Sequence, residues 1–373
     1  MNVEVLIYAY MAICASMIVF NCVCVFVFKH REEKLNHRNS DLAVQMRKEM
    51  EKIQSGEMVS EKHKRYLQKK LRYTGNLLTF DENIDVFCAE HSEGTKTYLT
   101  QNRAVFIYLV LYFQGKNRMK MAYLAYLLGK YKLSANMPID IISETMLTLV
   151  QEKSLYCREN ALHVLYSTGN EDCVAKAIKM IDQSGEFHHG KLLCDGLLTF
   201  AGDHKRLIKE IWNMLGELSA EMKVALLNYI RFESGGYEKE MMTLFADETQ
   251  DDEVRFACIR YFGKYHYEPA MPLLLKLCSQ EEEDRWEYTA IAADVLHLYP
   301  GKETIEVLKE ALHSFNWYVR LNAAQSLERM GFTYSDLADI FTGNDRYAAE
   351  ILEYTLEHKE IYEEERKGEK AAV

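Results

Sequence analysis

Few residues of this chain have the types and spacing that a catalytic or metal-binding site requires. The nearest approach to a metal-ligand set is His188-His189 followed by Cys194, because imidazole and thiolate are ligands that zinc prefers. Adjacent histidines at a helix start point to different sides, and only one cysteine is within reach. We therefore interpret the group as a solvated helix N-terminus. The acidic run Glu281–Asp284 is interpreted as a solvated loop and helix cap.

The motifs of nucleotide-binding and hydrolytic sites are missing from the sequence. It contains no GxGxxG, GxxxxGK[ST], HExxH or GxSxG. The aromatic residues of 261–267 have the composition of a stacking platform, but their helical spacing beside a turn favours packing between helices. We predict no catalytic, cofactor-binding or metal-binding residues and expect that the chain is not an enzyme. A lyase or glycosylase built on helical repeats is the alternative.

An internal repeat of 32 or 33 residues organises the chain from 154 to 345. Its reference positions are Arg158, Gly190, Lys223, Arg255, Tyr288 and Arg320. The residues three, four and seven positions further on are apolar, which is the pattern of one buried helix face. The residue five positions further on is mostly polar and marks the solvated face: His163, Asp195, Asn228, Arg260, Ala293 and Gln325.

Each repeat is expected to hold two helices. Polar residues, mostly Ser, Asp or Asn, stand where a first helix would need its N-cap: Ser154, Glu186, Ser219, Asp251, Asp284 and Asn316. Second amphipathic helices are expected at 172–182, 203–216, 237–246, 269–279, 302–313 and 334–342. Six such units predict an all-α fold, an α-solenoid. Further helices are expected at 59–73, 77–90, 97–114, 118–131 and 138–151.

Two of the repeats, 251–262 and 316–327, resemble HEAT-like repeats, including those of the phycobilisome-lyase type. They share the Asp or Asn cap, a Val-Arg pair (Val254-Arg255 and Val319-Arg320) and the small apolar pair that follows. The resemblance implies a HEAT/ARM-like stack of helices. It also implies a structural role for the repeat arginines, which bridge to the neighbouring unit in that family: Arg158, Arg255 and Arg320. The overall layout is similar to bacterial membrane-anchored repeat proteins that accompany envelope or polysaccharide machinery.

The N-terminal run Val5–Phe28 contains no charged residue. A bilayer core takes about 20 apolar helical residues, so the run predicts a single transmembrane helix. It is longer than the apolar core of a signal peptide, and no basic residue precedes it. Basic residues follow it directly: Lys29, Arg31, Lys34 and Arg38. The positive-inside rule then places the N-terminus outside the cell membrane and the repeat domain in the cytoplasm.

Charge and cysteine usage agree with this placement. Residues 29–72 hold 13 Lys+Arg against 7 Asp+Glu, whereas the whole chain has a net charge of −11, so the remainder is strongly acidic. A basic segment beside the membrane suits anionic lipids, and an acidic body argues against nucleic acid as a partner. The cysteines after the run form no CxxC pair, which is typical of a reducing compartment, and we expect them to be buried: Cys88, Cys157, Cys173, Cys194, Cys258 and Cys278.

Five segments follow from these patterns. They are a short N-terminus with the transmembrane helix (1–28), a charged helical stalk (29–58), an N-terminal helical part of the solenoid (59–153), the six repeats (154–345), and a capping helix with a charged tail (346–373). The stalk is expected to be solvated. A short coiled-coil seam is the alternative, because the stalk carries a thin apolar stripe: Leu35, Leu42, Met46, Met50 and Ile53.

The expected function is that of a membrane-tethered scaffold or adaptor. A solenoid offers a long surface to a protein partner, and we expect the second helices to line its concave side. The candidate partner-binding residues are the lysines of those helices: Lys176, Lys179, Lys205, Lys209, Lys239, Lys276 and Lys309. The alternative is an accessory or regulatory subunit of a membrane enzyme such as a glycan or polysaccharide synthase.

Overall fold

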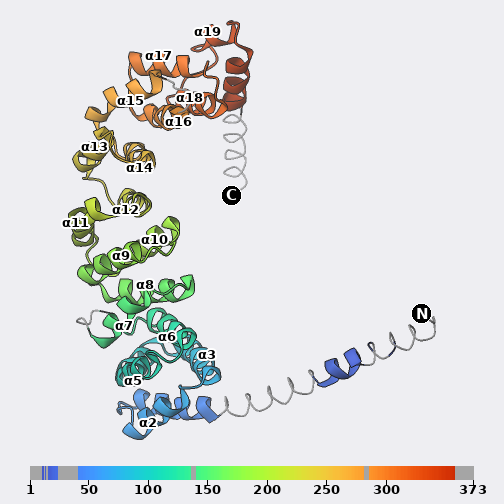
Figure 1. Cartoon of the computed structure of the whole chain (residues 1–373), viewed down its shortest axis with the longest axis vertical. Coiled ribbons are helices and arrows are strands. Elements are labelled where there is room, and N and C mark those ends of the chain that lie inside the picture. Colours follow the sequence, from blue (N-terminus) through green and yellow to red (C-terminus); the bar gives the residue numbers. More distant parts are fainter. Residues whose placement is uncertain are drawn as a thin grey trace. The chain divides into compact units, whose positions relative to one another are not determined.

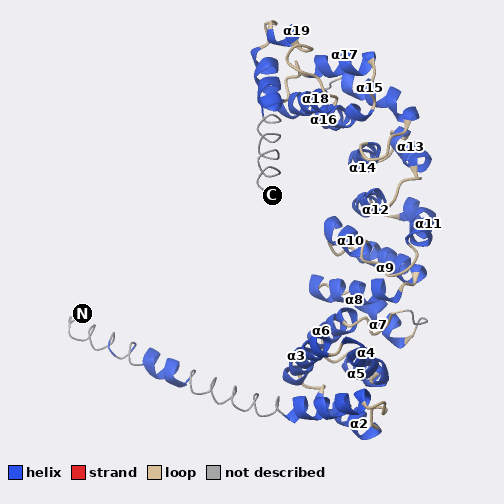
Figure 2. Cartoon of the chain, turned by 180° about the vertical axis from the view of Figure 1, so that it is seen from behind, coloured by secondary structure: helices blue, strands red, loops and turns tan. Residues whose placement is uncertain are grey.

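The computed structural model describes Met11, Ile13 and residues 16–23, 41–135, 140–280 and 285–357. All regular elements in these residues are helices, so the prediction of an all-α fold is confirmed (Figure 2). The chain divides into two compact units at residue 186, except that Ala201–Asp203 belong to the first unit.

The predicted transmembrane run Val5–Phe28 lies largely outside the described residues. Within the part that is described, no helix is long and apolar enough to cross a membrane. The acidic run Glu281–Asp284 and the charged tail 358–373 also lie outside the described residues.

The N-terminal unit contains a helix through 41–54, which is followed by α2 to α9. Their bounds are α2 Glu61–Lys70, α3 Thr74–Glu90, α4 Ser92–Gln101, α5 Arg103–Phe113, α6 Arg118–Lys130, α7 Ile141–Leu149, α8 Leu155–Thr168 and α9 Glu171–Ser184. Helix α5 lies in the middle, where it packs against α2, α6 and α7, and α6 packs against α8. Its side chains Phe106 and Leu109 are accordingly buried.

The helix through 41–54 belongs to the core of this unit. Its residues Leu42, Met46 and Met50 are fully or almost fully buried, and Met50 reaches α4 at Gly94. The expectation of a solvated stalk is therefore wrong for these residues. An apolar stripe gains free energy when it is removed from water, and α4 offers a surface on which it can pack.

The single helix expected at 97–114 is two helices, because the chain breaks at Asn102. This residue is fully buried, and its amide Nδ2 donates to the carbonyl of Tyr98 at 2.9 Å. Asparagine side chains compete in this way with the helical hydrogen bonds of the backbone, and here α4 ends and α5 begins.

The C-terminal unit continues as helix pairs. Its bounds are α10 Gly190–Leu197, α11 His204–Met214, η1 Leu215–Glu217, α12 Ala220–Glu233, α13 Glu238–Ala246, α14 Asp252–Phe262, η2 Glu268–Ala270, α15 Met271–Ser279, α16 Trp286–Val295, η4 Leu296–Leu298, α17 Lys302–Ala311, α18 Trp317–Arg329, α19 Ala338–Phe341 and a last helix through 346–357. The second helix expected at 334–342 is reduced to the single turn α19.

The first helices begin largely where the caps predict. Side chains of Ser219, Asp251 and Asn316 accept hydrogen bonds from backbone N–H groups in the first turns of α12, α14 and α18. The expected cap Glu186 is wrong, because α10 begins three residues later than the repeat predicts and His189 caps it.

The helices of the C-terminal unit form two layers. The first helices α10, α12, α14, α16 and α18 pack in succession, each against the next. The second helices α11, α13, α15 and α17 lie on the outer side of the bend within this unit (Figures 1 and 2). The expectation that the second helices line the concave side is therefore wrong for this unit.

Small residues allow the first helices to approach closely. A Cβ atom added at Gly190 would lie 3.2 Å from the Cβ of Ala225, and one added at Gly263 would lie 2.9 Å from Cγ2 of Val295. A stack of helix pairs bends toward the layer whose helices are more closely spaced. The first helices, which lie on the inner side of the bend, make close contacts of this kind.

The substitution Gly263→Ala tests this spacing. The new methyl group would meet the buried, β-branched Val295, and overpacking of this kind costs about 1–3 kcal/mol. We expect the free energy of unfolding, measured with a chemical denaturant, to fall by about that amount. The matched control is Gly216→Ala in η1, where nothing lies within 4 Å of the new Cβ. Equal effects of the two substitutions would contradict a spacing role for Gly263.

Candidate functional site

A groove of about 410 Å³ runs across four successive first helices in the C-terminal unit. We call it the basic groove. It is lined by Arg231 and Phe232 of α12, Arg260 of α14, Gly263 and Lys264 directly after α14, Ile291, Asp294 and Val295 of α16, and Asn322 of α18.

Lys264 ties two of these helices together. Its Nζ donates to the carbonyls of Arg231 and Phe232, at 3.0 and 3.1 Å, in the last turn of α12. A cation at this place is favourable, because the carbonyl end of a helix carries partial negative charge. The guanidinium of Arg231 lies over the ring of Phe232, 4.7 Å from its centroid. The cation–π contact orients Arg231 at the groove.

The groove has an excess of positive charge. The pKa of Arg231 is lowered from its ordinary value, first by burial and then by the positive charge of Arg260. Its Nε is buried without a hydrogen-bond partner, and Arg231 forms no ion pair within the described part of the chain. Arg260 has Glu253 as a carboxylate neighbour, but only at 4.0 Å and exposed to solvent. Asp294 is already paired with Arg329 at 2.8 Å.

The lysines that the sequence predicted as partner-binding residues lie on second helices. Lys176 and Lys179 are in α9 of the N-terminal unit. In the C-terminal unit, Lys205 and Lys209 are on α11, Lys239 on α13, Lys276 on α15 and Lys309 on α17. None of these seven lines the basic groove. Lys309 is engaged in an ion pair with Asp339 at 2.9 Å.

The cations of the basic groove were missed by the sequence analysis, although a signal was present. Arg260 stands five positions after the repeat reference Arg255, on the face that the pattern marks as solvated. Arg231 and Lys264 stand eight and nine positions after their own references. On a helix these positions extend the same face by about one turn. Aligning the last turns of the first helices would have found them.

Two of the repeat arginines bind the backbone that precedes their helix. Arg158 Nη1 donates to the carbonyls of Glu152 and Lys153, at 2.8 and 2.9 Å, and Arg158 is buried. Arg320 Nη1 donates to the carbonyl of Ser314 at 2.7 Å. Each guanidinium thus ties the first helix of a repeat to the end of the repeat before it.

Arg255 joins its own repeat to the repeats before and after it. Its Nε donates to the carbonyl of Phe245 at 3.1 Å, and its Nη1 donates to the hydroxyl of Tyr288 at 3.0 Å. Tyr288 occupies the reference position of the next repeat, and its hydroxyl donates to Asp252 at 2.5 Å. Burial, together with the carboxylate of Asp252, raises the pKa of Tyr288 to about 12. The tyrosine takes the place of an arginine and extends the network.

The remaining sequence candidates have local roles. His189 Nδ1 accepts from the N–H of Lys191 at the start of α10. Among the described residues, no three His, Cys, Asp or Glu side chains gather where they could hold a metal ion. Tyr261 and Phe262 are buried between helices. The cysteines are buried as expected, except for Cys88, which is exposed.

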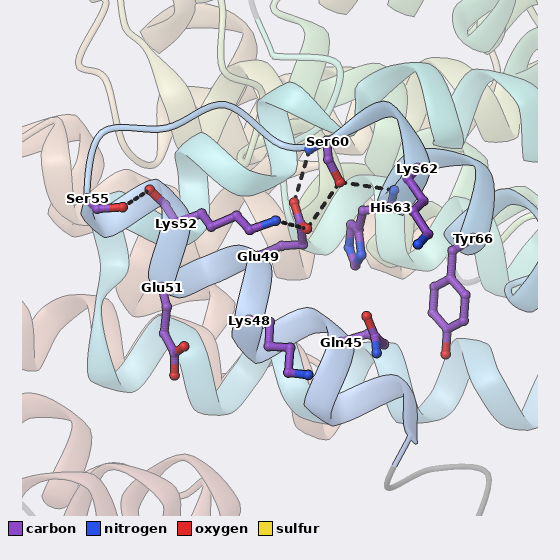
Figure 3. Close-up of a pocket in the computed structure, with 10 residues that line it drawn as sticks. All are labelled: Gln45, Lys48, Glu49, Glu51, Lys52, Ser55, Ser60, Lys62, His63 and Tyr66. Atoms are coloured by element: carbon purple, nitrogen blue, oxygen red, sulfur yellow. Dashed lines mark hydrogen bonds and ion pairs between the residues drawn. The ribbon is translucent and has the colours of Figure 1, made fainter.

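A second cleft, of about 660 Å³, lies in the N-terminal unit between the helix through 41–54 and α2 (Figure 3). The carboxylate of Glu49 accepts from Lys52 Nζ at 2.8 Å and from the N–H and hydroxyl of Ser60 at 3.0 and 3.1 Å. Ser60 in turn caps α2. The buried His63 is hydrogen-bonded to the hydroxyl of Tyr98 at 2.8 Å. These polar groups form hydrogen bonds with one another. The bonds hold neighbouring helices together, and we assign these side chains a structural role.

The stability of the N-terminal unit should depend on His63. Burial lowers the pKa of His63 to about 4, below its ordinary value of 6.5. Above pH 7 the imidazole is neutral in both states. As the pH falls through 6.5 the unfolded chain binds a proton that the folded chain does not. The free energy of unfolding therefore falls, by on the order of 2–3 kcal/mol between pH 7 and pH 4.5.

The variant His63→Gln isolates this contribution, because other titrating groups are common to both proteins. Denaturant unfolding at pH 7, 6, 5 and 4.5 should show a shallower loss of stability in the variant. Parallel pH dependences of the two proteins would mean that His63 is not buried in its neutral form.

Comparisons with known proteins add little to this geometry. No protein-family model matches the chain, and no curated protein matches it. Among solved structures, the chain has a likeness to human deoxyhypusine hydroxylase in complex with glycerol. The identity is 14%, the TM-score is 0.28, and the match covers 80% of this chain and 96% of that chain. At this TM-score the likeness carries no argument about the function of this chain.

Proposed function

We propose that this chain is a HEAT-like helical-repeat scaffold that binds a protein partner along the first helices of its C-terminal unit. The observation that carries the proposal is the basic groove. It crosses four successive first helices and holds the half-buried Arg231, which pairs with no carboxylate among the residues that the structure describes. A stack of repeats presents such a surface as a continuous face, which is the usual way in which solenoids bind other proteins.

The chemistry of the groove supports binding more than catalysis. Its polar side chains are cations, one amide that is bonded to the backbone, and one carboxylate that is paired with an arginine. Arginine and aromatic side chains are enriched among the residues that dominate protein–protein binding energy. Arg231, Arg260 and the half-exposed Phe232 are side chains of this kind.

The proposal includes attachment to a membrane through the run Val5–Phe28, with the repeats in the cytoplasm. It rests on the length and apolar character of that run and on the basic residues that follow it. Attachment would confine the partner to the membrane surface and raise its local concentration there.

A photo-crosslinking amino acid at Phe232 tests the proposed binding face. We expect covalent adducts of one defined mass in the source cells, because Phe232 is exposed in the groove. The control places the same amino acid at Lys239, which is exposed on α13 in the outer layer. The captured protein, once purified, must also bind the purified chain saturably. Adducts from Lys239 alone would return the binding face to the second helices, and equal adducts from both positions would remove the case for the groove.

A further inference from the structure

The geometry points to the basic groove as a site for carboxylate side chains of a partner's acidic segment, in which glutamate or aspartate alternates with apolar residues. This inference rests on the proposed function and names the class of partner. The groups that would receive the carboxylates are the guanidiniums of Arg231 and Arg260, which come from neighbouring helices and border the same groove.

Arg231 is the group whose charge is least satisfied. Its Nε is buried and has no hydrogen-bond partner in the described part of the chain, and its environment disfavours the charged form. A partly buried positive charge without a counter-ion costs free energy, which a bound carboxylate would recover. The planar fork of guanidinium donors matches the two oxygens of a carboxylate, so a bidentate pair can form.

The other polar groups of the groove are already engaged. Lys264 is bonded to two carbonyls of α12, and the amide of Asn322 donates to the carbonyl of Ala290 at 2.8 Å. Asp294 would repel a carboxylate, but its charge is balanced by Arg329. The net charge of the side chains that line the groove is therefore positive. Arg231 belongs to α12, and Arg260 belongs to the neighbouring helix α14.

The apolar lining favours a peptide over other anions. Ile291 of α16 and the half-exposed ring of Phe232 line the groove, and the buried Val295 lies at the same place. Inorganic phosphate has no apolar part to place against them. Nucleic acid needs a long run of cations, whereas the chain as a whole has a net charge of −11. A segment that carries both carboxylates and apolar side chains matches both features.

Fluorescence anisotropy with the full chain in a nonionic detergent tests the inference. The probe is a fluorescein-labelled dodecapeptide of repeated Glu-Glu-Leu, and the matched probe replaces every Glu by Gln. We expect saturable binding of the Glu peptide that weakens with added salt, and at least tenfold weaker binding of the Gln peptide. The substitutions Arg231→Gln and Arg260→Gln should each weaken binding of the Glu peptide by roughly tenfold or more, because each removes a charge-assisted contact.

The control variant is Lys239→Gln, which removes a positive charge from the outer layer of the same unit and should leave binding unchanged. Thermal unfolding separates binding from folding. No carboxylate of the described ranges pairs with Arg231, so Arg231→Gln should unfold at the same temperature as the native chain or higher. A lower unfolding temperature together with weaker binding would assign Arg231 to the fold and overturn the inference.

Three further outcomes would overturn the inference: equal binding of the Glu and Gln peptides, native affinity in both arginine variants, or preferential binding of oligothymidylate or of vesicles containing phosphatidylserine. The two proposals can fail separately. Phe232 could crosslink to a partner that the Arg231→Gln and Arg260→Gln variants still bind normally. This result would support the scaffold function and contradict the specificity for an acidic segment. If the Glu peptide binds but no adduct forms from Phe232 in cells, the groove binds acidic segments and the proposed scaffold function is contradicted.

Discussion

The close approach of successive first helices is the constraint on which the C-terminal unit depends. Glycine and alanine at the contact points let α10 approach α12 and let the end of α14 approach α16. Interiors are packed as densely as organic crystals, so an added methyl group at such a point must displace its neighbours. The packing of one repeat on the next, and the groove that crosses the first helices, depend on this spacing.

The same spacing explains why charge collects on one face. Where the first helices come together, their buried faces are apolar, and their last turns leave the core at the inner surface. Arg231 and Arg260 occupy those turns, while Lys264 bonds to the carbonyl end of α12. Because the neighbouring carboxylate Asp294 is paired with Arg329, the excess charge is not cancelled locally.

The sequence predicted the helical repeats well, because their signal is local. A helix face and its N-cap are specified within a few residues, and the caps at Ser219, Asp251 and Asn316 form as expected. It failed where the outcome depends on distant residues. Whether the stripe with Met46 and Met50 is solvated depends on a surface some forty residues away, and the break at Asn102 depends on burial of its amide.

The site was harder to predict than the fold for the same reason. Lysines on amphipathic helices are visible in the sequence, but which layer is concave depends on contacts between repeats. Arg231 and Arg260 lie in different repeats, 29 positions apart, and become neighbours only when the helices stack. The excess of positive charge around them also depends on distant residues, because Asp294 pairs with Arg329 rather than with either arginine of the groove.

The network of Arg255, Tyr288 and Asp252 has a mechanical consequence. Hydrogen bonds that run from one repeat to the next oppose the separation of neighbouring helix pairs, so this junction is stiffer than one joined by apolar contacts alone. The basic groove lies across the same junction, since α14 and α16 both line it. A segment bound there would hold α14 and α16 together on one side of the stack. By thermodynamic linkage, a force that straightened the unit would also lower its affinity for that segment.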